Sequence, residues 1–341
     1  MTEAETQERV LVYVGGELMG DGLNKLPFLR ALRRAYPTAW ITWFAGSGPT
    51  VYAGKLAPAV SRYIDEIVGV EQGAESWMNV LQPRLRGRRF DVIIDTKRKL
   101  RPTIELKRIP HGRLVSGTVN GLLSERRAPG QPLRPAKPPH FLGQLLQLLS
   151  LARYGRIDGP VDPSGRVDVP ARCHEAAADL LPERKSVILA PGAGGAKKRW
   201  PLAHFVSVAR AVEGRGYTPV IALGPGEADL RAELSEELPR ARFPLQAASG
   251  DTLADEPFMT MALAQRACAA LANDSGNAHI LAASGVPLVV LFGATNAEKF
   301  APAGTHVSVI RARDHAESLV DLPVETVLPR LFAVMDAPGK A

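Results

Sequence analysis

Residues 273–279 read Asn-Asp-Ser-Gly-Asn-Ala-His, and this stretch is the most informative about the fold. It lies between an apolar run at 268–272 and a helical pattern that starts at Ile280. This order predicts a strand, a tight polar turn and the start of a helix. In a parallel α/β unit such a turn opens onto the ligand crevice, where the unpaired N–H groups of the next helix suit an anion, above all a diphosphate.

Three side chains in this turn support the prediction of a phosphate site. Ser275 can add a hydroxyl donor, Gly276 lets the backbone approach a ligand closely, and His279 lies in the first helical turn. The alternative is that Asp274 or Ser275 only caps the helix. A second loop of phosphate-binding type, about eighty residues earlier, favours the ligand site.

That second loop, at 191–201, reads Pro-Gly-Ala-Gly-Gly-Ala-Lys-Lys-Arg-Trp-Pro and follows an apolar strand at 186–190. Its glycines, Gly194 among them, make the backbone pliable, and its cations, Lys198 among them, supply charge for an anion. The spacing matches neither a Walker A loop nor a dinucleotide fingerprint. Because we expect Lys198 on an exposed loop, its replacement should leave stability nearly unchanged.

Length and composition predict two globular domains. The chain has 341 residues, with 45% hydrophobic and 23% charged residues, which suits two domains of about 150–180 residues. Its two cysteines, Cys173 and Cys268, form no ligand or redox motif, so a reducing cytoplasm is expected. Residues 1–9 are polar and no apolar run approaches the length of a membrane span. Contact with a membrane surface stays open.

Strands and helices alternate along the whole chain, which predicts an α/β protein with parallel sheets. A proline-rich stretch at 128–140 and a connector at 158–169 separate two such series. We expect two Rossmann-like domains, 1–170 and 171–341, facing one another across a cleft, with the last helix able to pack back on the N-terminal domain. The expected strands are 10–14, 39–44, 66–70, 90–95, 114–116, 186–190, 218–223, 269–273 and 287–292.

Asp21 follows the first expected strand in the run Gly-Gly-Glu-Leu-Met-Gly-Asp-Gly-Leu at 15–23. This position predicts an aspartate at the mouth of the crevice and at the start of a helix. Asp21 could act as a general base that takes a proton from a hydroxyl group. The alternative is an N-cap aspartate with no catalytic role.

The positive charge of the chain is concentrated in one run. Between Arg84 and Arg113 stand eleven Lys/Arg against three acids, a net charge of +8 in a chain whose total is +7. Residues 84–89 are expected to form a solvated face. The cations that follow the strand ending at Asp95 should lie at the crevice and engage an anionic acceptor; these are Lys97, Arg98, Lys99 and Arg101. No helix-turn-helix, zinc or aromatic RNA-binding pattern accompanies them, so no nucleic-acid partner is expected.

Four segments together resemble glycosyltransferase family 9, the heptosyltransferases of lipopolysaccharide core assembly. They are Gly-Asp-x-Leu-x-x-x-Pro at 20–27, Lys-Arg-Trp-Pro at 198–201, Asn-Asp-Ser-Gly-x-x-His at 273–279 and Pro-Leu-Val-Val-Leu-Phe-Gly at 287–293. The resemblance implies a GT-B fold, an ADP-heptose donor in the C-terminal half and an anionic glycolipid acceptor in the N-terminal half. It also implies inverting transfer without a metal ion or other cofactor, and it leaves room for peripheral contact with the cytoplasmic face of the inner membrane.

Carried over by residue, the resemblance makes Asp21 the catalytic aspartate and Lys198 the contact to donor phosphate. Glu227 resembles the carboxylate that holds the nucleotide ribose. Lys25 stands where a small hydroxyl residue is more usual and joins the acceptor-binding set. The donor-binding set is Gly194, Lys198, Glu227, Asp274, Ser275, Gly276 and His279.

The chain contains no Asp-x-Asp pair, which argues against a metal-bridged diphosphate. A nucleotide-sugar epimerase of the same fold, or a non-catalytic nucleotide-sugar binder, remains the alternative to a transferase.

Overall fold

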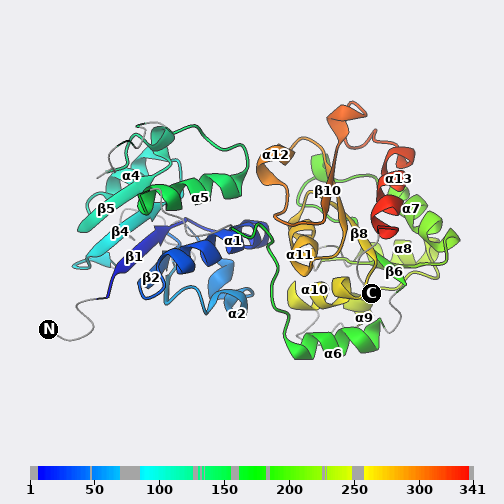
Figure 1. Cartoon of the computed structure of the whole chain (residues 1–341). Helices are drawn as coiled ribbons and strands as arrows, with labels where there is room; N and C mark the ends of the chain where they lie inside the picture. The colour runs from blue at the N-terminus through cyan, green and yellow to red at the C-terminus, as the bar shows by residue number, and fades with distance from the viewer. Residues whose placement is uncertain are drawn as a thin grey trace. The chain divides into compact units, whose positions relative to one another are not determined.

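The computed structural model describes residues 7–46, 48–69, 85–125, 130, 133, 135–154, 161–181, 185–224, 227, 229–247 and 257–337. The chain divides into two compact units, Met1–Asp162 and Pro163–Ala341 (Figure 1). This division falls inside the connector that the sequence predicts at 158–169.

The N-terminal unit is built on a five-stranded parallel sheet of order β3-β2-β1-β4-β5. Its central strand, β1, is buried along nearly its whole length, as its run of apolar side chains requires. β1 pairs with β2 on one side and β4 on the other, so Tyr13 lies level with Phe44 and Asp95. The strands are β1 (Arg9–Tyr13), β2 (Trp40–Phe44), β3 (Glu66–Val68), β4 (Phe90–Asp95) and β5 (His111–Ser116).

Helices and short 3₁₀ turns connect these strands. The longest helix, α1, packs against α5, and α5 also contacts β4 and β5. In the described part of the chain, no helix is both long and apolar enough to cross a membrane. The elements are α1 (Met19–Ala35), η2 (Val51–Ala53), α2 (Ala57–Val60), α4 (Leu100–Leu106), η3 (Thr118–Gly121) and α5 (Phe141–Ala152).

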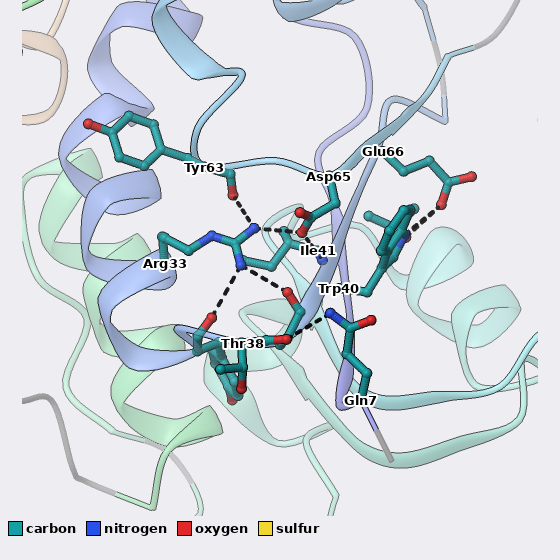
Figure 2. Close-up of polar contacts among 11 residues, drawn as sticks. Gln7, Arg33, Thr38, Trp40, Ile41, Tyr63, Asp65 and Glu66 are labelled. Atoms are coloured by element: carbon teal, nitrogen blue, oxygen red, sulfur yellow. Dashed lines mark hydrogen bonds and ion pairs between the residues drawn. The ribbon is translucent and has the colours of Figure 1, made fainter. Parts of the chain in front are cut away.

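Arg33, near the end of α1, ties this helix to the amino edge of the sheet (Figure 2). Its guanidinium donates to the carbonyl oxygens of Ala39 at 2.9 Å and Tyr63 at 3.1 Å and pairs with Asp65 at 2.5 Å. The same Asp65 oxygen accepts the backbone N–H of Ile41 at 2.7 Å. One arginine therefore links α1 to the segments that enter β2 and β3.

Arg88 departs from the solvated basic face that the sequence predicts for 84–89. Its guanidinium pairs with Glu66 at 2.5 Å and stacks over the Phe90 ring, 5.2 Å from the centroid. This arginine links the segment before β4 to β3. Arg86 and Arg89 are exposed, as predicted, whereas Arg84 lies outside the described residues.

The C-terminal unit repeats the architecture with a second five-stranded parallel sheet, of order β10-β9-β8-β6-β7. β6, β8 and β9 are buried at every position. The two parallel sheets confirm the predicted α/β fold class with two Rossmann-like domains. The strands are β6 (Ser186–Ala190), β7 (Thr218–Ile221), β8 (Ala269–Asn273), β9 (Leu288–Phe292) and β10 (Val307–Arg311).

The last helix, α13 (Val324–Met335), buries Val327, Leu331 and Met335 in the core of the C-terminal unit. It contacts α7, β8 and β9, so its apolar face is anchored in its own unit. The other helices and 3₁₀ turns are α6 (Ala171–Leu180), η4 (Ala196–Lys198), α7 (Leu202–Gly214), α8 (Leu230–Glu237), α9 (Pro244–Ala247), α10 (Pro257–Gln265), α11 (Gly276–Ser284), α12 (Ala297–Phe300) and η7 (Ala312–Asp314).

We predict that Arg33→Met destabilises the N-terminal unit. The substitution leaves Asp65 without its guanidinium partner and two carbonyl oxygens without a donor, which should cost about 1–3 kcal/mol of unfolding free energy. Urea unfolding followed by circular dichroism measures the change. Arg86→Met, at an exposed position before β4, is the control, and equal stability of the two variants would contradict the role given to Arg33.

Candidate functional site

Asp21 lies in the first turn of α1 with its side chain exposed. The N-cap residue is Leu18, three residues before Asp21, and no side chain caps this helix end. The alternative that Asp21 is the N-cap is therefore wrong. Its carboxylate stands at the positive end of the helix, beyond the carboxyl end of β1, where a reacting group would be accessible.

A buried ion pair between Glu17 and Lys25 joins the segment before α1 to the first turns of this helix. Glu17 also accepts hydrogen bonds from Trp43 Nε1 at 2.8 Å and from Thr50 Oγ1 at 2.7 Å. The Lys25 side chain is only 3% exposed, and its ammonium group faces Glu17. This internal partner makes Lys25 a support for the helix start, whereas the sequence predicts a direct contact to an acceptor.

Asp95, the last residue of β4, organises the loop that carries the predicted acceptor-binding cations. It is fully buried and accepts hydrogen bonds from Thr103 Oγ1 at 2.6 Å, Ser116 Oγ at 2.7 Å and the Lys97 backbone N–H at 3.0 Å. Thr118 extends the cluster, with its hydroxyl 2.8 Å from that of Thr103. The carboxylate thus holds the start of the loop to α4 and β5.

Lys97 brings the loop into electrostatic contact with the start of α1. Burial lowers the pKa of the Lys97 ammonium group, and the charge of Lys25 lowers it further, whereas Asp21 and Glu17 raise it. Lys97 is thus within electrostatic range of Lys25, Asp21 and Glu17. The structure therefore places Lys97 near the predicted catalytic aspartate.

The other cations of the run take different positions. Arg98 lies against the backbone of Gly117, and its Nη1 is 3.4 Å from Asn120 Oδ1. Lys99 is the N-cap residue of α4 and is exposed, as is Arg101 two residues further. The cations of the run therefore differ: Lys97 is partly buried and interacts electrostatically with Asp21, whereas Lys99 and Arg101 are exposed.

In the C-terminal unit, Asn273 joins the two predicted phosphate loops. Its side-chain oxygen accepts the N–H of Trp200 at 3.2 Å, and its side-chain nitrogen donates to the carbonyl oxygen of Pro191 at 2.7 Å. Asn273 is fully buried at the end of β8. Asn273 was given no role of its own on the sequence alone, although a polar residue at the end of an apolar strand indicates a buried hydrogen-bonding group.

The loop from β6 also carries an ion pair to the loop after β8. Lys198 Nζ lies 2.8 Å from Asp274 Oδ2, with Asp274 buried and Lys198 40% exposed. Asp274 thus orients the lysine, whose partly exposed ammonium can still meet a phosphate. Because a buried carboxylate depends on this lysine, the expectation that replacing Lys198 leaves stability unchanged has to be corrected.

Glu227 reaches back to the same loop. Its Oε2 accepts the N–H of Gly224 at 2.9 Å, and a Cβ atom at position 192 would lie 1.6 Å from its Oε1. Gly192 is therefore the glycine that this contact requires. Gly194 is exposed with open space around it, so its role as a donor contact stays a prediction.

Ser275 stands at the N-terminus of α11 as its N-cap residue. Its hydroxyl oxygen is buried and lacks a hydrogen-bond partner among the described residues, and its side chain does not cap the helix. Gly276 begins the helix and is exposed, and His279 is buried one turn later. An unpaired hydroxyl beside the free N–H groups of a helix start is a ready site for a phosphate oxygen.

Beside this cluster is a cavity of about 550 Å³, for which the sequence gives no signal. It opens at the carboxyl ends of β9 and β10 and shares Lys197 with the phosphate loop. Gly293 lines one side of the cavity, where its backbone lies close to that of Lys197. A Cβ atom at position 293 would lie 2.9 Å from the carbonyl oxygen of Lys197. The polar lining includes Thr295, Asn296, Arg311, Arg313, Glu317 and Ser318.

Two Rossmann-like units, each built on a five-stranded parallel sheet, define a protein of the GT-B fold class. The family model of glycosyltransferase family 9 (heptosyltransferase) matches residues 78–323. The chain belongs to this family. The match covers the basic loop and the whole donor-binding set, and it begins after Asp21.

Individual relatives agree with this family. A lipopolysaccharide heptosyltransferase 2 of Escherichia coli is 30% identical over 175 residues, which are 46% of this chain and 48% of the relative. A lipooligosaccharide heptosyltransferase 2 of Haemophilus influenzae is 27% identical over 188 residues, 50% and 53% of the two chains. The chain thus spans about half the length of the curated relatives it matches.

Solved structures show the same fold over nearly the entire chain. A family 9 glycosyltransferase from Veillonella parvula has a TM-score of 0.70 at 19% identity, covering 96% of this chain and 97% of the other. An E. coli heptosyltransferase solved with ADP has a TM-score of 0.66 at 17% identity, covering 96% and 99%.

We predict that Asp95 makes stability depend on pH. Burial raises the pKa of Asp95 from its ordinary value of 3.8 to about 6, although Thr103 and Ser116 lower it. Between these two values the folded protein binds a proton that the unfolded chain has released. The stabilisation from Asp95 is therefore complete below the unfolded pKa and is lost as the pH rises through about 6.

Comparison with Asp95→Asn, which stays neutral, isolates this effect. Relative to that variant, the wild type should lose unfolding free energy between about pH 4 and pH 7 in urea titrations. Asp91→Asn, on an exposed position of the same strand, is the control. A pH profile parallel to that of Asp95→Asn would show that Asp95 is not the responsible group.

A double-mutant cycle tests the Lys198–Asp274 pair. Lys198→Ala leaves a buried carboxylate unpaired and should cost about 1–3 kcal/mol of unfolding free energy. Adding Asp274→Asn should recover most of that loss, because the uncompensated charge is gone. Binding of ADP, measured by calorimetry, should stay weak in both variants. Recovery of ADP binding in the double variant would contradict a phosphate contact by Lys198.

Proposed function

We propose that this protein is an inverting, metal-independent glycosyltransferase that moves a heptose from ADP-heptose to a lipopolysaccharide core or similar anionic glycan. The observation that carries the proposal is the site at the start of α11. There Lys198 is held by Asp274, and the buried Ser275 hydroxyl has no hydrogen-bond partner among the residues that the structure describes. This combination of donors suits a nucleotide diphosphate. Membership in glycosyltransferase family 9 supports the same reaction class.

In the proposed donor complex, the diphosphate lies at the start of α11. Lys198 and the Ser275 hydroxyl contact its oxygens, and the backbone N–H groups from Gly276 onward add further donors. Gly194 lets the loop approach, and His279 closes the site from the first helical turn. Glu227, whose carboxylate packs against Gly192, accepts hydrogen bonds from the ribose hydroxyls.

In the proposed acceptor complex, the N-terminal unit binds the glycan. Asp21 acts as the general base because its carboxylate is exposed at the start of α1. Lys97, with Arg98, Lys99 and Arg101, contacts the anionic groups of the acceptor. Lys25 stabilises the start of α1 through its buried ion pair with Glu17.

The proposed reaction is a single displacement. Asp21 takes the proton from the acceptor hydroxyl while that oxygen forms a bond to the anomeric carbon of the heptose. The bond from that carbon to the diphosphate breaks at the same time, and ADP leaves with the bonding electron pair. Lys198 and the helix N–H groups stabilise the negative charge that develops on the diphosphate. Attack from the face opposite ADP inverts the configuration.

This assignment places the protein in the cytoplasm, where ADP-sugars are made, with peripheral access to the cytoplasmic face of the inner membrane. The alternatives, a nucleotide-sugar epimerase or a non-catalytic binder, predict different products. Incubation with ADP-heptose and a lipopolysaccharide core acceptor, followed by mass spectrometry, separates the three. A transferase adds one heptose to the acceptor, an epimerase changes the free nucleotide sugar, and a binder changes neither.

We predict that Asp21→Asn lowers kcat by about two orders of magnitude or more while ADP binding stays nearly unchanged. The amide keeps the size of the side chain and removes the basic oxygen. Steady-state kinetics and calorimetry with ADP measure the two effects. Asp229→Asn is a matched control, because Asp229 is also exposed at a helix start without a capping hydrogen bond. Near-normal turnover in Asp21→Asn would remove Asp21 from the chemistry.

A further inference from the structure

The N-terminal unit exposes four large aliphatic side chains on two neighbouring elements. Leu100 and Ile104 lie on α4, one helical turn apart and thus on the same face. Val119 and Leu122 lie in and directly after η3. All four are between 39% and 55% exposed. Soluble proteins seldom expose such side chains in a group without a binding role.

A hydrogen-bonded contact holds the two elements together. The hydroxyl groups of Thr103 on α4 and Thr118 on η3 are 2.8 Å apart, and both threonines are buried. Each immediately precedes an exposed aliphatic residue, Ile104 in one case and Val119 in the other. The buried cluster around Asp95 therefore fixes the position of the exposed aliphatic side chains as well as that of the basic loop.

The backbone at Val119 is an independent sign of function. Val119 has φ 50° and ψ 44°, and Asn120 has φ 52° and ψ 41°. The left-handed region is unfavourable for a β-branched residue, whereas asparagine tolerates it. A strained valine with an exposed side chain contributes nothing to a core. Such strain is retained where the side chain itself is needed.

Positive charge surrounds the aliphatic group. Residues 97–125 contain seven Lys/Arg and two Glu, a net charge of +5. Both glutamates are already paired, Glu105 with Arg108 and Glu125 with Lys107. The exposed cations Lys99 and Arg101 flank Leu100 directly. The surface therefore combines aliphatic side chains with a net positive charge.

We propose that the surface formed by Lys99, Leu100, Arg101, Ile104, Val119 and Leu122, here named the α4–η3 patch, docks the protein on an anionic lipid bilayer. Aliphatic side chains that enter the headgroup region, together with cations that attract anionic lipids, are the two contributions a peripheral protein needs for stable binding. A soluble anionic glycan would explain the cations but would leave the aliphatic side chains exposed.

The patch also relates the membrane to the proposed reaction. It begins two residues after Lys97, whose ammonium senses the charge of Asp21. The segment after β4 thus carries Lys97, whose charge interacts with that of Asp21, and two residues later the first residues of the patch, Lys99, Leu100 and Arg101. The docking proposal goes beyond the proposed reaction, because vesicle binding is measured without donor or acceptor.

The test is co-sedimentation of the full chain with phosphatidylcholine vesicles that contain or lack phosphatidylglycerol. The wild type should bind the anionic vesicles, bind the neutral ones far more weakly, and lose affinity as salt is added. Ile104→Ser together with Val119→Asn should lower partitioning onto anionic vesicles at least about tenfold. Equal binding of this variant and the wild type would overturn the proposal.

Two further variants separate docking from folding. Val119→Asn alone should raise the melting temperature, because asparagine accepts the left-handed backbone, while it weakens vesicle binding. A structural role for Val119 would instead lower the melting temperature. Trp40→Ser removes an exposed apolar side chain at the start of β2, which lies on the other side of β1 from β4 and β5; Figure 2 labels Trp40. It should leave vesicle binding unchanged.

Two outcomes identify a different occupant or a failed reaction. If the wild type ignores vesicles but dimerises in light-scattering measurements, and the Ile104→Ser, Val119→Asn variant is monomeric, the patch is an interface between two copies and the proposal is wrong. If vesicle binding follows the prediction but no heptose is transferred, the docking surface stands and the proposed reaction fails.

Discussion

Parallel strand pairing is the constraint from which the remaining features of both units follow. A parallel pair needs a crossover connection, so each strand of a sheet enters at one edge and leaves at the other. In the N-terminal unit the ends of β1, β4 and β5 meet at one edge, and in the C-terminal unit the ends of β6, β7 and β8 do the same. Both candidate sites are built from the loops that leave those edges.

Buried polar side chains at the strand ends turn these loops into defined structures. Asp95 ends β4 and accepts hydrogen bonds from three neighbouring segments, and Asn273 ends β8 and joins two loops. A buried polar group without a partner is costly, so each such residue selects one loop arrangement. Ser275 is an exception, because its buried hydroxyl has no protein partner in the described structure, and this indicates a ligand-binding role.

Local patterns predicted the strands well because buried parallel strands are continuous apolar runs. The expected strands 90–95, 186–190 and 269–273 agree with β4, β6 and β8 to within a residue. β10 was missed because Val307–Arg311 alternates with polar residues at the sheet edge and is only partly buried. The short helix α4 was missed because it carries a proline and is bounded by cations on both sides.

The sequence by itself determined the fold class, the family resemblance and the positions of the two loops predicted to bind phosphate, because these depend on the spacing of apolar residues, glycine placement and residue order. Only the tertiary structure decided which partner each charged side chain meets. Lys25 faces Glu17, Asp274 orients Lys198, and Glu227 rests on Gly192. Those contacts join residues from different strands and loops, and the distances between them arise from packing, which no local pattern in the chain encodes.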